Sequence, residues 1–417
     1  MPEKIYGLLG RTLGHSWSVP IHAAVGNQGY RLIELEPEEL PAFLARPDIG
    51  GLNVTIPYKR DVMAYCDVID PAAQAIGSVN TLVRRPDGKL YAWNTDISGF
   101  LYMARRAGVE MKDRKVMILG SGGTSLTAQA AARACGAREI VVVSRHGADN
   151  YDNLSRHGDA EIVVNTTPVG MYPHTGESAA DLTKFPACQG VLDVVYNPRR
   201  TALLLQAEAL GLPCSDGLPM LVFQATAAAE YFFDRKINPA ENERILALLH
   251  REMENIVLIG MPGCGKSTVG AELAALTGRG AVDLDAEIVK TAGKSIPDIF
   301  AQDGEPAFRA LEQQAAERFG RESKKILICG GGIVKSPQNY GFLHQTGRIY
   351  QLDRCLEKLP TDGRPLSQGA DLATMAADRA PLYRRFRDAL IDNNGAPQDA
   401  AKRIWRDFCA DTDSQRT

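Results

Sequence analysis

The stretch with the most evident chemistry is GMPGCGKST, at residues 260–268. It matches the phosphate-loop pattern G-x-x-x-x-G-K-[ST] at its fixed positions, which are Gly260, Gly265, Lys266 and Ser267. Glycines allow successive backbone N–H groups to converge on phosphate oxygens. The lysine places a positive charge near the β- and γ-phosphates, and the serine hydroxyl can ligate Mg²⁺. The stretch therefore predicts a nucleotide site formed by Gly263, Cys264, Gly265, Lys266, Ser267 and Thr268.

The elements around this loop have the types that such a site needs. Residues 256–259 form an apolar run typical of a buried strand, and residues 269–278 have helical spacing and end in Gly278. A glycine-rich turn that matches the pattern by chance is the alternative. A strand before the loop and a helix after it favour nucleotide binding.

Charged residues further along the chain could complete this site. Asp283 and Asp285 lie two apart at the predicted end of a strand, so they should point to the same side. One suits Mg²⁺ and the other a substrate hydroxyl. Arg309 is expected on a helix and Arg379 at the start of another. The three glycines at 330–332 follow an apolar strand and would allow a close approach to the backbone.

The first hundred residues present polar side chains where short apolar strands end. The segment GGLNVTIPYK carries Thr55 and Lys59 at its end, AIGSVNTLV places Asn80 on another short strand, and LYAWNTDISGF ends a third with Asn94, Thr95 and Asp96. Polar side chains at the ends of several strands are typical of a cleft at the open edge of an α/β sheet.

Three other polar residues have simple explanations when each is considered alone. Ser16 and Ser18 precede a helix that Pro20 is expected to start, as in a turn with a helix cap. Gln224 lies within an apolar helical face, where a buried glutamine can simply bond to the backbone.

A strand–turn–helix–strand unit typical of dinucleotide binding follows. The strand KVMILG leads into a turn with Gly120, Gly122 and Gly123, and the alanine-rich helix after it ends at Gly136. The third position of G-x-G-x-x-G is a serine, but the surrounding unit has the correct order. Arg145, at the end of the next strand, favours the 2′-phosphate of NADP, unless it is simply a solvated arginine at a loop start.

Length and composition limit the classes of protein. At 417 residues the chain is too long for one ordinary core, so two or three domains are expected. The net charge of −3 argues against a general binder of nucleic acid or membrane surfaces. The eight cysteines are scattered and the seven histidines lack metal-ligand spacing, so no structural zinc is expected. With no basic-then-apolar leader and no long apolar run, a reduced, cytoplasmic protein is expected, and the oligomeric state stays open.

Together these motifs resemble a pair of known enzymes. Residues 1 to about 250 are similar to shikimate dehydrogenases through GHSWS, NVTIPYK, GSVNT, NTDISG, GSGGTS, NTTPVGM, VVYNP and GLPMLVFQA. Residues from about 255 to 410 resemble shikimate kinases through GCGKST, DLD, EPAFRALE, CGGG, GRPL and RAPLY. The resemblance implies an α/β fold in three parts: an α/β substrate domain (1–100), a Rossmann NADP-binding domain whose last helices return to the substrate domain (101–253), and a P-loop kinase domain with a parallel sheet (254–412).

In the dehydrogenase half, the resemblance implies that Lys59 and Asp96 are the catalytic pair. A partly desolvated lysine beside a carboxylate can deliver a proton to the alkoxide that develops when a hydride from NADPH reduces a ketone. The implied substrate-binding residues, which override the simple explanations above, are Ser16, Ser18, Thr55, Asn80, Tyr196 and Gln224. The implied cofactor-binding residues are Gly120, Gly122, Gly123, Thr124, Arg145 and Gly217.

In the kinase half, the resemblance implies that Asp285, Arg309 and Arg379 bind shikimate. Two arginines can hold its carboxylate, while the aspartate holds ring hydroxyls and can accept the proton of the attacking one. Arg364, in the loop LPTDGRPLSQG, is expected to close over the ATP phosphates like a lid. The remaining implied roles are catalysis for Lys266 and Asp285, backbone contacts with substrate for Gly331 and Gly332, and Mg²⁺ ligation for Ser267 and Asp283.

Cys264 is an unusual residue to leave exposed in a phosphate loop. Oxidation of Cys264 is therefore expected to block ATP binding.

Both halves are expected to act on small-molecule substrates, with no nucleic acid or membrane as a partner.

The implied function is reduction of 3-dehydroshikimate to shikimate with NADPH, followed by phosphorylation of shikimate with ATP and Mg²⁺. One alternative is a dehydrogenase half that prefers quinate or NAD. Another is a non-catalytic half that only binds shikimate or regulates the kinase, against which the presence of both Lys59 and Asp96 speaks. A nucleoside-type kinase is disfavoured by the set Asp285, Arg309 and Arg379.

Overall fold

The computed structural model describes residues 4–14, 16–359 and 372–414, and the predicted α/β fold is confirmed. Contacts between residues divide the chain into two compact units. The first unit comprises Met1–Val169, Ala179–Tyr196 and Gln206–Leu246. The second comprises Gly170–Ser178, Asn197–Leu205 and Ala247–Thr417.

The first part of the chain forms a six-stranded mixed sheet in the order β2-β1-β3-β5-β6-β4. Strand β1 pairs in parallel with β2 and β3, whereas β5 runs antiparallel to β3 and β6. Every residue of β3 is buried, because this strand lies inside the sheet. The strands are β1 (Ile5–Gly10), β2 (Tyr30–Glu34), β3 (Ile49–Val54), β4 (Val68–Ile69), β5 (Thr81–Arg84) and β6 (Leu90–Trp93), and the helices are α1 (Ser18–Ala24), α2 (Leu40–Leu44), α3 (Pro71–Ile76) and α4 (Asp96–Arg106).

The second sheet is the predicted dinucleotide unit, extended to five parallel strands in the order β11-β10-β9-β7-β8. The apolar run KVMIL is buried along its whole length as β7, next to β8 and β9. Its strands are β7 (Lys115–Leu119), β8 (Glu139–Val143), β9 (Ile162–Asn165), β10 (Gly190–Asp193) and β11 (Cys214–Ser215). The helices that follow or connect them are α5 (Gly123–Ala134), α6 (Ala202–Ala209), α7 (Leu218–Phe233) and α8 (Ala240–Met253).

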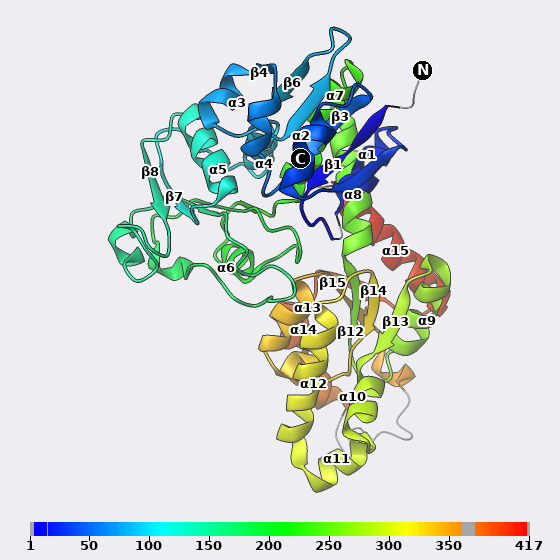
Figure 1. The fold of residues 1–417 in the computed structure, drawn as a ribbon. Helices are drawn as coiled ribbons and strands as arrows, with labels where there is room; N and C mark the ends of the chain where they lie inside the picture. Colours follow the sequence, from blue (N-terminus) through cyan, green and yellow to red (C-terminus); the bar gives the residue numbers. More distant parts are fainter. Residues whose placement is uncertain (1–3, 15, 360–371, 415–417) are drawn as a thin grey trace. The chain divides into compact units, whose positions relative to one another are not determined.

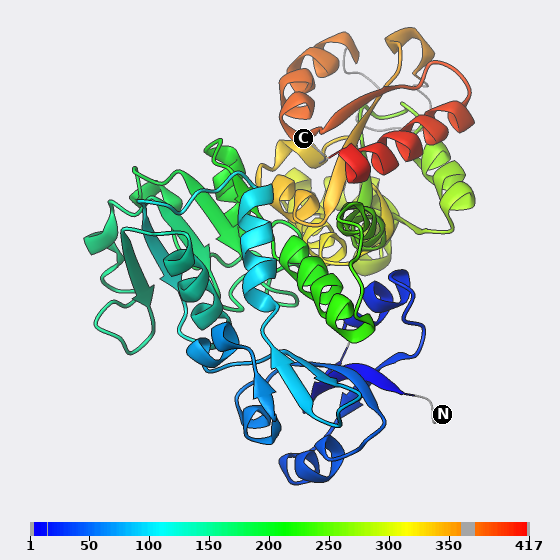
Figure 2. The ribbon, with the colours of Figure 1, turned by 90° about the horizontal axis from the view of Figure 1, so that it is seen from above.

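Helices α4 and α7 pack closely side by side, as Figure 2 shows for the cyan and green helices. The contact is close because Gly99 of α4 has no side chain. A β-carbon there would come within 2.6 Å of the backbone oxygen of Met220 and 3.1 Å of Cβ of Gln224. The first turn of α4 and the middle of α7 are therefore held together.

The third sheet has five parallel strands in the order β13-β14-β12-β15-β16. Helices α12 and α13 lie on one side of it and α9 and α15 on the other (Figure 1). The strands are β12 (Asn255–Ile259), β13 (Gly280–Asp283), β14 (Lys325–Ile328), β15 (Gly347–Asp353) and β16 (Ala389–Asp392). The helices are α9 (Lys266–Thr277), α10 (Leu284–Ala292), α11 (Ile296–Gln302), α12 (Gly304–Gly320), α13 (Gln338–His344), α14 (Leu372–Phe386) and α15 (Pro397–Ser414).

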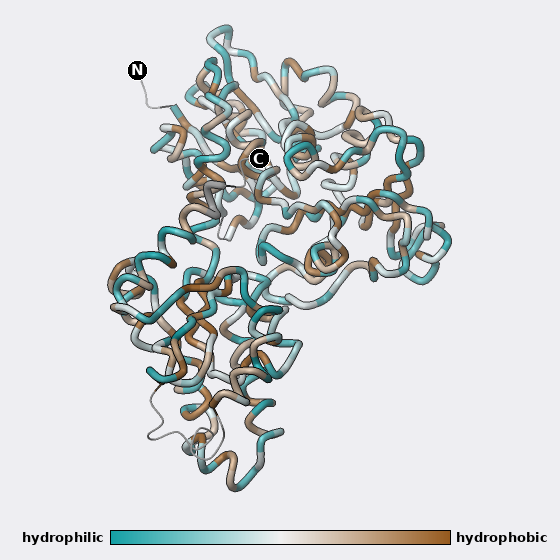
Figure 3. Tube along the Cα trace, turned by 180° about the vertical axis from the view of Figure 1, so that it is seen from behind, coloured by the Kyte–Doolittle hydropathy of each residue, from teal (hydrophilic) through white to brown (hydrophobic). Residues whose placement is uncertain are grey.

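Each sheet carries its own apolar core. Figure 3 shows the hydrophobic stretches in brown running through the interior of each unit. The core of the third sheet includes Val257, Leu327 and Ile349, on three adjacent strands. Among the described residues, no helix is both long and apolar enough to cross a membrane.

Candidate active sites

The first candidate site is built around Lys59 and Asp96, which the structure brings into contact. Lys59 Nζ lies 2.6 Å from Asp96 Oδ2, and the two side chains are 26% and 12% exposed. Asp96 is the first residue of α4, where its backbone N–H donates to Asn94 Oδ1 at 3.0 Å. The local fold after β6 therefore fixes the carboxylate, while its lysine partner comes from the turn after β3.

Asn80 and Gln224 meet beside this pair although they lie far apart in the sequence. The Asn80 side-chain amide donates to Gln224 Oε1 at 3.4 Å, and Asn80 Oδ1 accepts a 2.7 Å bond from the backbone of Thr95. Asn80 is thus tied directly to the residue before Asp96. It lies one residue before β5 and not within it, although its backbone still bonds to Val54 and Trp93 on the two neighbouring strands. Gln224 also donates to the backbone carbonyl of Leu221, as expected for a glutamine in an apolar helical face that bonds to the backbone.

The other four predicted substrate residues, Ser16, Ser18, Thr55 and Tyr196, are less closely connected to this pair. Ser16 Oγ accepts a 3.2 Å bond from the backbone N–H of Ser18, which stabilises the turn before α1. The predicted helix cap is wrong, because Trp17 occupies the cap position and its side chain makes no capping bond. The helix begins at Ser18, two residues before the proline that was expected to start it. Thr55 and Tyr196 are half-buried, and burial raises the pKa of the tyrosine. In the described part of the chain, no hydrogen bond joins Ser16, Thr55 or Tyr196 to the lysine–aspartate pair.

The glycine turn after β7 fits the pyrophosphate of a dinucleotide. Gly120 has a φ of +106°, and a β-carbon on it would lie 2.8 Å from Cγ2 of Thr167. Gly122 caps α5 and Gly123 begins it, and a β-carbon on either would meet nothing within 4 Å, so the start of α5 is open. An open helix N-terminus of this kind attracts phosphate groups.

The other predicted cofactor residues lie at different depths in the first unit. Thr124 lies in the first turn of α5 and is half-buried, whereas Arg145 is exposed two residues after β8. Gly217 is buried at the start of α7, where its N–H donates to the carbonyl of Val195 at 3.0 Å. An exposed arginine after the second strand suits a 2′-phosphate.

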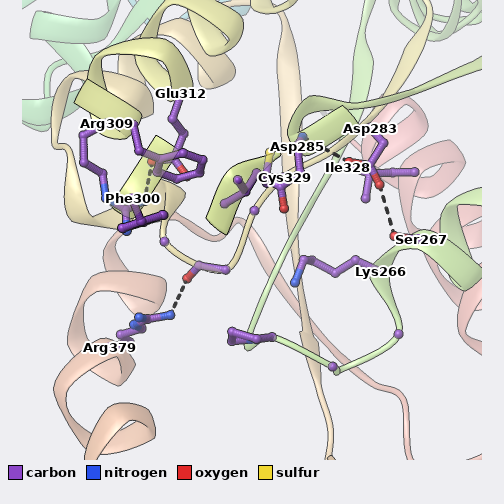
Figure 4. A pocket seen from close by; sticks show the side chains of 18 of the residues that line it. Lys266, Ser267, Asp283, Asp285, Phe300, Arg309, Glu312, Ile328, Cys329 and Arg379 are labelled. Carbon is purple, nitrogen blue, oxygen red and sulfur yellow. Dashed lines mark hydrogen bonds and ion pairs between the residues drawn. The ribbon is translucent and has the colours of Figure 1, made fainter. Parts of the chain in front are cut away.

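The second candidate site is a cavity of about 590 Å³ at the ends of the strands of the third sheet. Figure 4 shows its side chains converging from the phosphate loop, α10, α12 and α14. The predicted residues that line it are Gly263, Gly265, Lys266, Ser267, Thr268, Asp283, Asp285, Arg309, Gly331, Gly332 and Arg379.

The phosphate loop joins β12 to α9 through three glycines in the left-handed region, Gly260, Gly263 and Gly265, with φ of +143°, +84° and +96°. Lys266 Nζ donates to the carbonyls of Gly260 and Met261 at 2.9 and 3.0 Å. Ser267 Oγ donates to Asp283 Oδ2 at 3.2 Å, so a hydroxyl and a carboxylate lie together next to the loop. Oxygen donors of this kind fit Mg²⁺.

The two aspartates are arranged differently from the prediction. Only Asp283 ends a strand; it caps α10 by accepting a 3.0 Å bond from the N–H of Asp285, which lies in the first turn of that helix. The cap turns the chain so that both carboxylates still line the cavity. Burial, and then the charge of Asp283, raise the pKa of Asp285.

Each of the three consecutive glycines makes room for another part of the site. A β-carbon on Gly330 would lie 2.5 Å from Asp285 Oδ1, and one on Gly331 would lie 2.7 Å from the Pro262 ring. One on Gly332 would collide with the guanidinium of Arg309. The predicted close approach to this backbone is therefore made by residues of the chain itself.

Arg309 and Arg379 both lie against this glycine segment, Arg309 at Gly332 and Arg379 at Gly331. Arg379 Nη1 donates to the carbonyl of Gly331 at 3.0 Å, and Arg309 Nη1 pairs with Glu312 Oε2 at 2.7 Å (Figure 4). The sequence prediction missed Glu312, although its spacing of three residues from Arg309 on one helix could have indicated it. Burial raises the pKa of Glu312 to about 7.

Three further expectations for the kinase half concern Arg379, Cys264 and Arg364. Arg379 lies in the middle of α14, not at a helix start, because α14 already runs from Leu372 and continues through Pro381. Cys264 is fully buried in the core of the sheet, so the exposed thiol expected there is wrong and the oxidation hypothesis loses its basis. Arg364 lies outside the described residues.

Asn393 is a further residue that the sequence prediction missed. It follows β16, is buried, and donates from Nδ2 to the carbonyl of Cys264 at 2.7 Å. A β-carbon on Gly265 would lie 2.7 Å from the same nitrogen. Asn393 therefore stabilises the phosphate loop through its contacts with Cys264 and Gly265.

Comparison with known proteins relates the first and last parts of the chain to two different families. A family model for the shikimate dehydrogenase substrate binding domain matches residues 8–82, and one for shikimate kinase matches residues 262–408. The shikimate dehydrogenase (NADP(+)) of Clostridium perfringens is 35% identical over 263 residues, which are 58% of this chain and 97% of that protein.

Two solved structures extend the likeness to the fold of the first part. One is a chorismate mutase/shikimate 5-dehydrogenase fusion protein from Clostridium acetobutylicum, with 35% identity and a TM-score of 0.57 over 60% of this chain and 97% of that one. The other is quinate dehydrogenase from Corynebacterium glutamicum in complex with NAD, with 27% identity and a TM-score of 0.54 over 59% and 99%. The chain belongs to the shikimate dehydrogenase family in its N-terminal part and continues into a shikimate kinase domain, so that one polypeptide joins two enzymes.

Proposed function

We propose that the chain catalyses two consecutive reactions on one carbon skeleton. The first is 3-dehydroshikimate plus NADPH and a proton giving shikimate and NADP⁺. The second is shikimate plus ATP giving shikimate 3-phosphate and ADP. The proposal is supported by the two families that the chain matches and by the two separate clusters of polar groups described above.

In the dehydrogenase half, NADPH supplies the hydride when it is bound. Lys59 is proposed to donate the proton to the oxygen that becomes the new hydroxyl, and Asp96 to hold the ammonium group in position through their 2.6 Å contact. Asn80 and Gln224, which already bond to each other, are proposed to hold ring hydroxyls. Ser16 and Ser18 are proposed to bind the carboxylate, with Thr55 and Tyr196 as neighbours.

The cofactor residues proposed for this half are those of the turn after β7. Gly120, Gly122, Gly123 and Thr124 would hold the pyrophosphate at the start of α5, and Gly217, at the start of α7, is proposed as a further cofactor contact. Arg145 is proposed to bind the 2′-phosphate that distinguishes NADP from NAD.

In the kinase half, Arg309 and Arg379 are proposed to hold the shikimate carboxylate next to Gly331 and Gly332. Asp285 is proposed to accept the proton of the attacking hydroxyl, and its raised pKa makes it a better acceptor than an ordinary aspartate. The amides of the phosphate loop and Lys266 would hold the ATP phosphates. Ser267 and Asp283 would hold Mg²⁺, which neutralises phosphate charge when bound, and Arg364 would close over the γ-phosphate.

We assign residues 1–100 to the substrate domain, 101–253 to the NADP domain and 254–412 to the kinase domain. A cytoplasmic location, where NADPH and ATP are both available, is part of the same proposal.

The observation that carries the proposal is that Lys59 and Asp96 form one site while Asp285, Arg309 and Arg379 line another. The test uses the purified full chain with 3-dehydroshikimate, NADPH, Mg²⁺ and ATP. We expect NADPH to be consumed first and ADP to form only after shikimate accumulates. ADP formation without NADPH, from 3-dehydroshikimate alone, would contradict the order.

A second candidate for the first half is a dehydrogenase that prefers quinate or NAD. The likeness to a quinate dehydrogenase in complex with NAD supports this second candidate function. Comparing kcat/KM for shikimate and quinate with NADP⁺ and NAD⁺, in all four combinations, decides between them. We expect shikimate with NADP⁺ to give the highest value, and a preference for quinate or NAD⁺ would replace the first reaction.

A further inference from the structure

Arg354 is a cation of the kinase cavity that neither the sequence motifs nor the proposed mechanism uses. It follows directly after β15, the strand next to β12, and lines the cavity. Ligands of parallel α/β sheets bind beyond the carboxyl ends of the strands, which is where Arg354 lies.

The guanidinium of Arg354 lies beside the phosphate loop. A β-carbon built on Gly265 would be 3.7 Å from Arg354 Nη1. Gly265 is the residue before Lys266 and caps α9, so it marks the point where the loop amides and the helix N-terminus converge. Asn393, which follows β16, holds the phosphate loop next to Gly265 through its bond to the carbonyl of Cys264.

The other cations of the cavity already have partners. Lys266 donates to two loop carbonyls, Arg309 pairs with Glu305 and Glu312, and Arg379 donates to the carbonyl of Gly331. Arg354 has no hydrogen bond or ion pair within residues 4–14, 16–359 and 372–414, and its Nε atom is buried without a partner. A partly buried guanidinium without a hydrogen-bond partner gains more free energy from binding an anion than a cation that already has one.

We infer that Arg354 is a further nucleotide-binding residue, whose guanidinium donates charge-assisted hydrogen bonds to the phosphate chain of the nucleotide at Gly265. The planar fork of arginine matches phosphate oxygens, and the neighbouring loop brings the same oxygens within its reach. The inference rests on the proposed kinase function of this cavity and adds a residue to it. Arg354 would thereby contribute to nucleotide affinity and not to shikimate affinity, because the shikimate arginines approach from α12 and α14.

The test is calorimetric binding of Mg·ADP, inorganic tripolyphosphate, adenosine and shikimate to the full chain. Arg354→Ala should weaken ADP and tripolyphosphate binding by about ten- to a hundredfold, the effect of losing a hydrogen bond to a charged group. Shikimate binding should stay unchanged, and Arg354→Lys should recover part of the loss because it restores the charge without the fork.

Arg384→Ala is the matched control, because it removes the same charge from an exposed position on α14. Equal ADP affinity in the Arg354→Ala and Arg384→Ala proteins would overturn the inference. So would a loss of adenosine binding with tripolyphosphate binding unchanged, which would mean that Arg354 stacks on the base. Failure of the unmodified chain to bind ADP or tripolyphosphate would instead refute the proposed kinase function. Thermal unfolding of each variant checks that it is folded.

Discussion

Replacing Lys59 by methionine removes the ammonium group but keeps most of the apolar stem. The structure has its Nζ atom 2.6 Å from Asp96 Oδ2, with both side chains mostly covered. If Lys59 is the proton donor, its loss should lower kcat for ketone reduction by about 10²- to 10⁴-fold, or about 3–5 kcal/mol in the barrier. A purely structural ion pair would leave kcat of the folded protein nearly unchanged. Because this pair is mostly buried, its loss would instead lower the unfolding free energy, by up to about 3–5 kcal/mol. The two explanations therefore differ in which quantity changes.

The assay follows NADPH oxidation and ADP formation separately in the same preparation of the Lys59→Met protein. Phosphorylation of added shikimate should keep its full rate, which also shows that the kinase half is folded. Asp96→Asn is the companion variant, and the double variant should be little slower than Lys59→Met alone if the two residues act as a unit. A reduction rate within tenfold of the unmodified chain, or an equal loss of both activities, would refute the reasoning.

Three further predictions follow from the geometry of the two sites. Because burial raises the pKa of Glu312 from 4.5 to about 7, its contribution to the unfolding free energy is greatest below pH 4.5. It should fall by up to about 3 kcal/mol as the pH rises through 7, and denaturant titrations in which Glu312→Gln has the same pH profile would contradict this. Gly332→Ala should displace Arg309 and raise KM for shikimate by about tenfold with little change in KM for ATP; equal changes in both would argue against separate subsites. Gly120→Ala, strained at a φ of +106°, should raise KM for NADPH while phosphorylation persists, and an unchanged KM would exclude the turn as the cofactor site.

Sequence patterns predicted most of the fold and the types of its sites. The phosphate loop and the dinucleotide turn were predictable because both depend on local requirements: a buried strand, glycines with a positive φ, and a helix that starts at the loop. The role of the triple glycine was predicted only in part. The sequence indicates that something approaches the backbone at 330–332, but only the folded chain shows Asp285, Pro262 and Arg309 there.

Other features depend on contacts that no local pattern encodes. Arg354 and Asn393 belong to segments that sheet order brings next to the phosphate loop, so they could not be associated with it from spacing. The burial of Cys264 follows from the path of the loop over the sheet, which the sequence does not reveal. The position of Asp285 was missed because a helix cap at Asp283 replaced the expected continuation of the strand.

The contact at Gly99 has a consequence for anyone who wishes to redesign substrate choice. Because α4 and α7 touch there without an intervening side chain, any bulk added at this crossing would shift the Asp96 turn and the Gln224 turn at the same moment. New specificity for a differently substituted ring should therefore be sought at the tip of residue 224, for example with Gln224→Glu or Gln224→Asn. Such exchanges leave the helix spacing intact and alter only the group that is proposed to bind the ring.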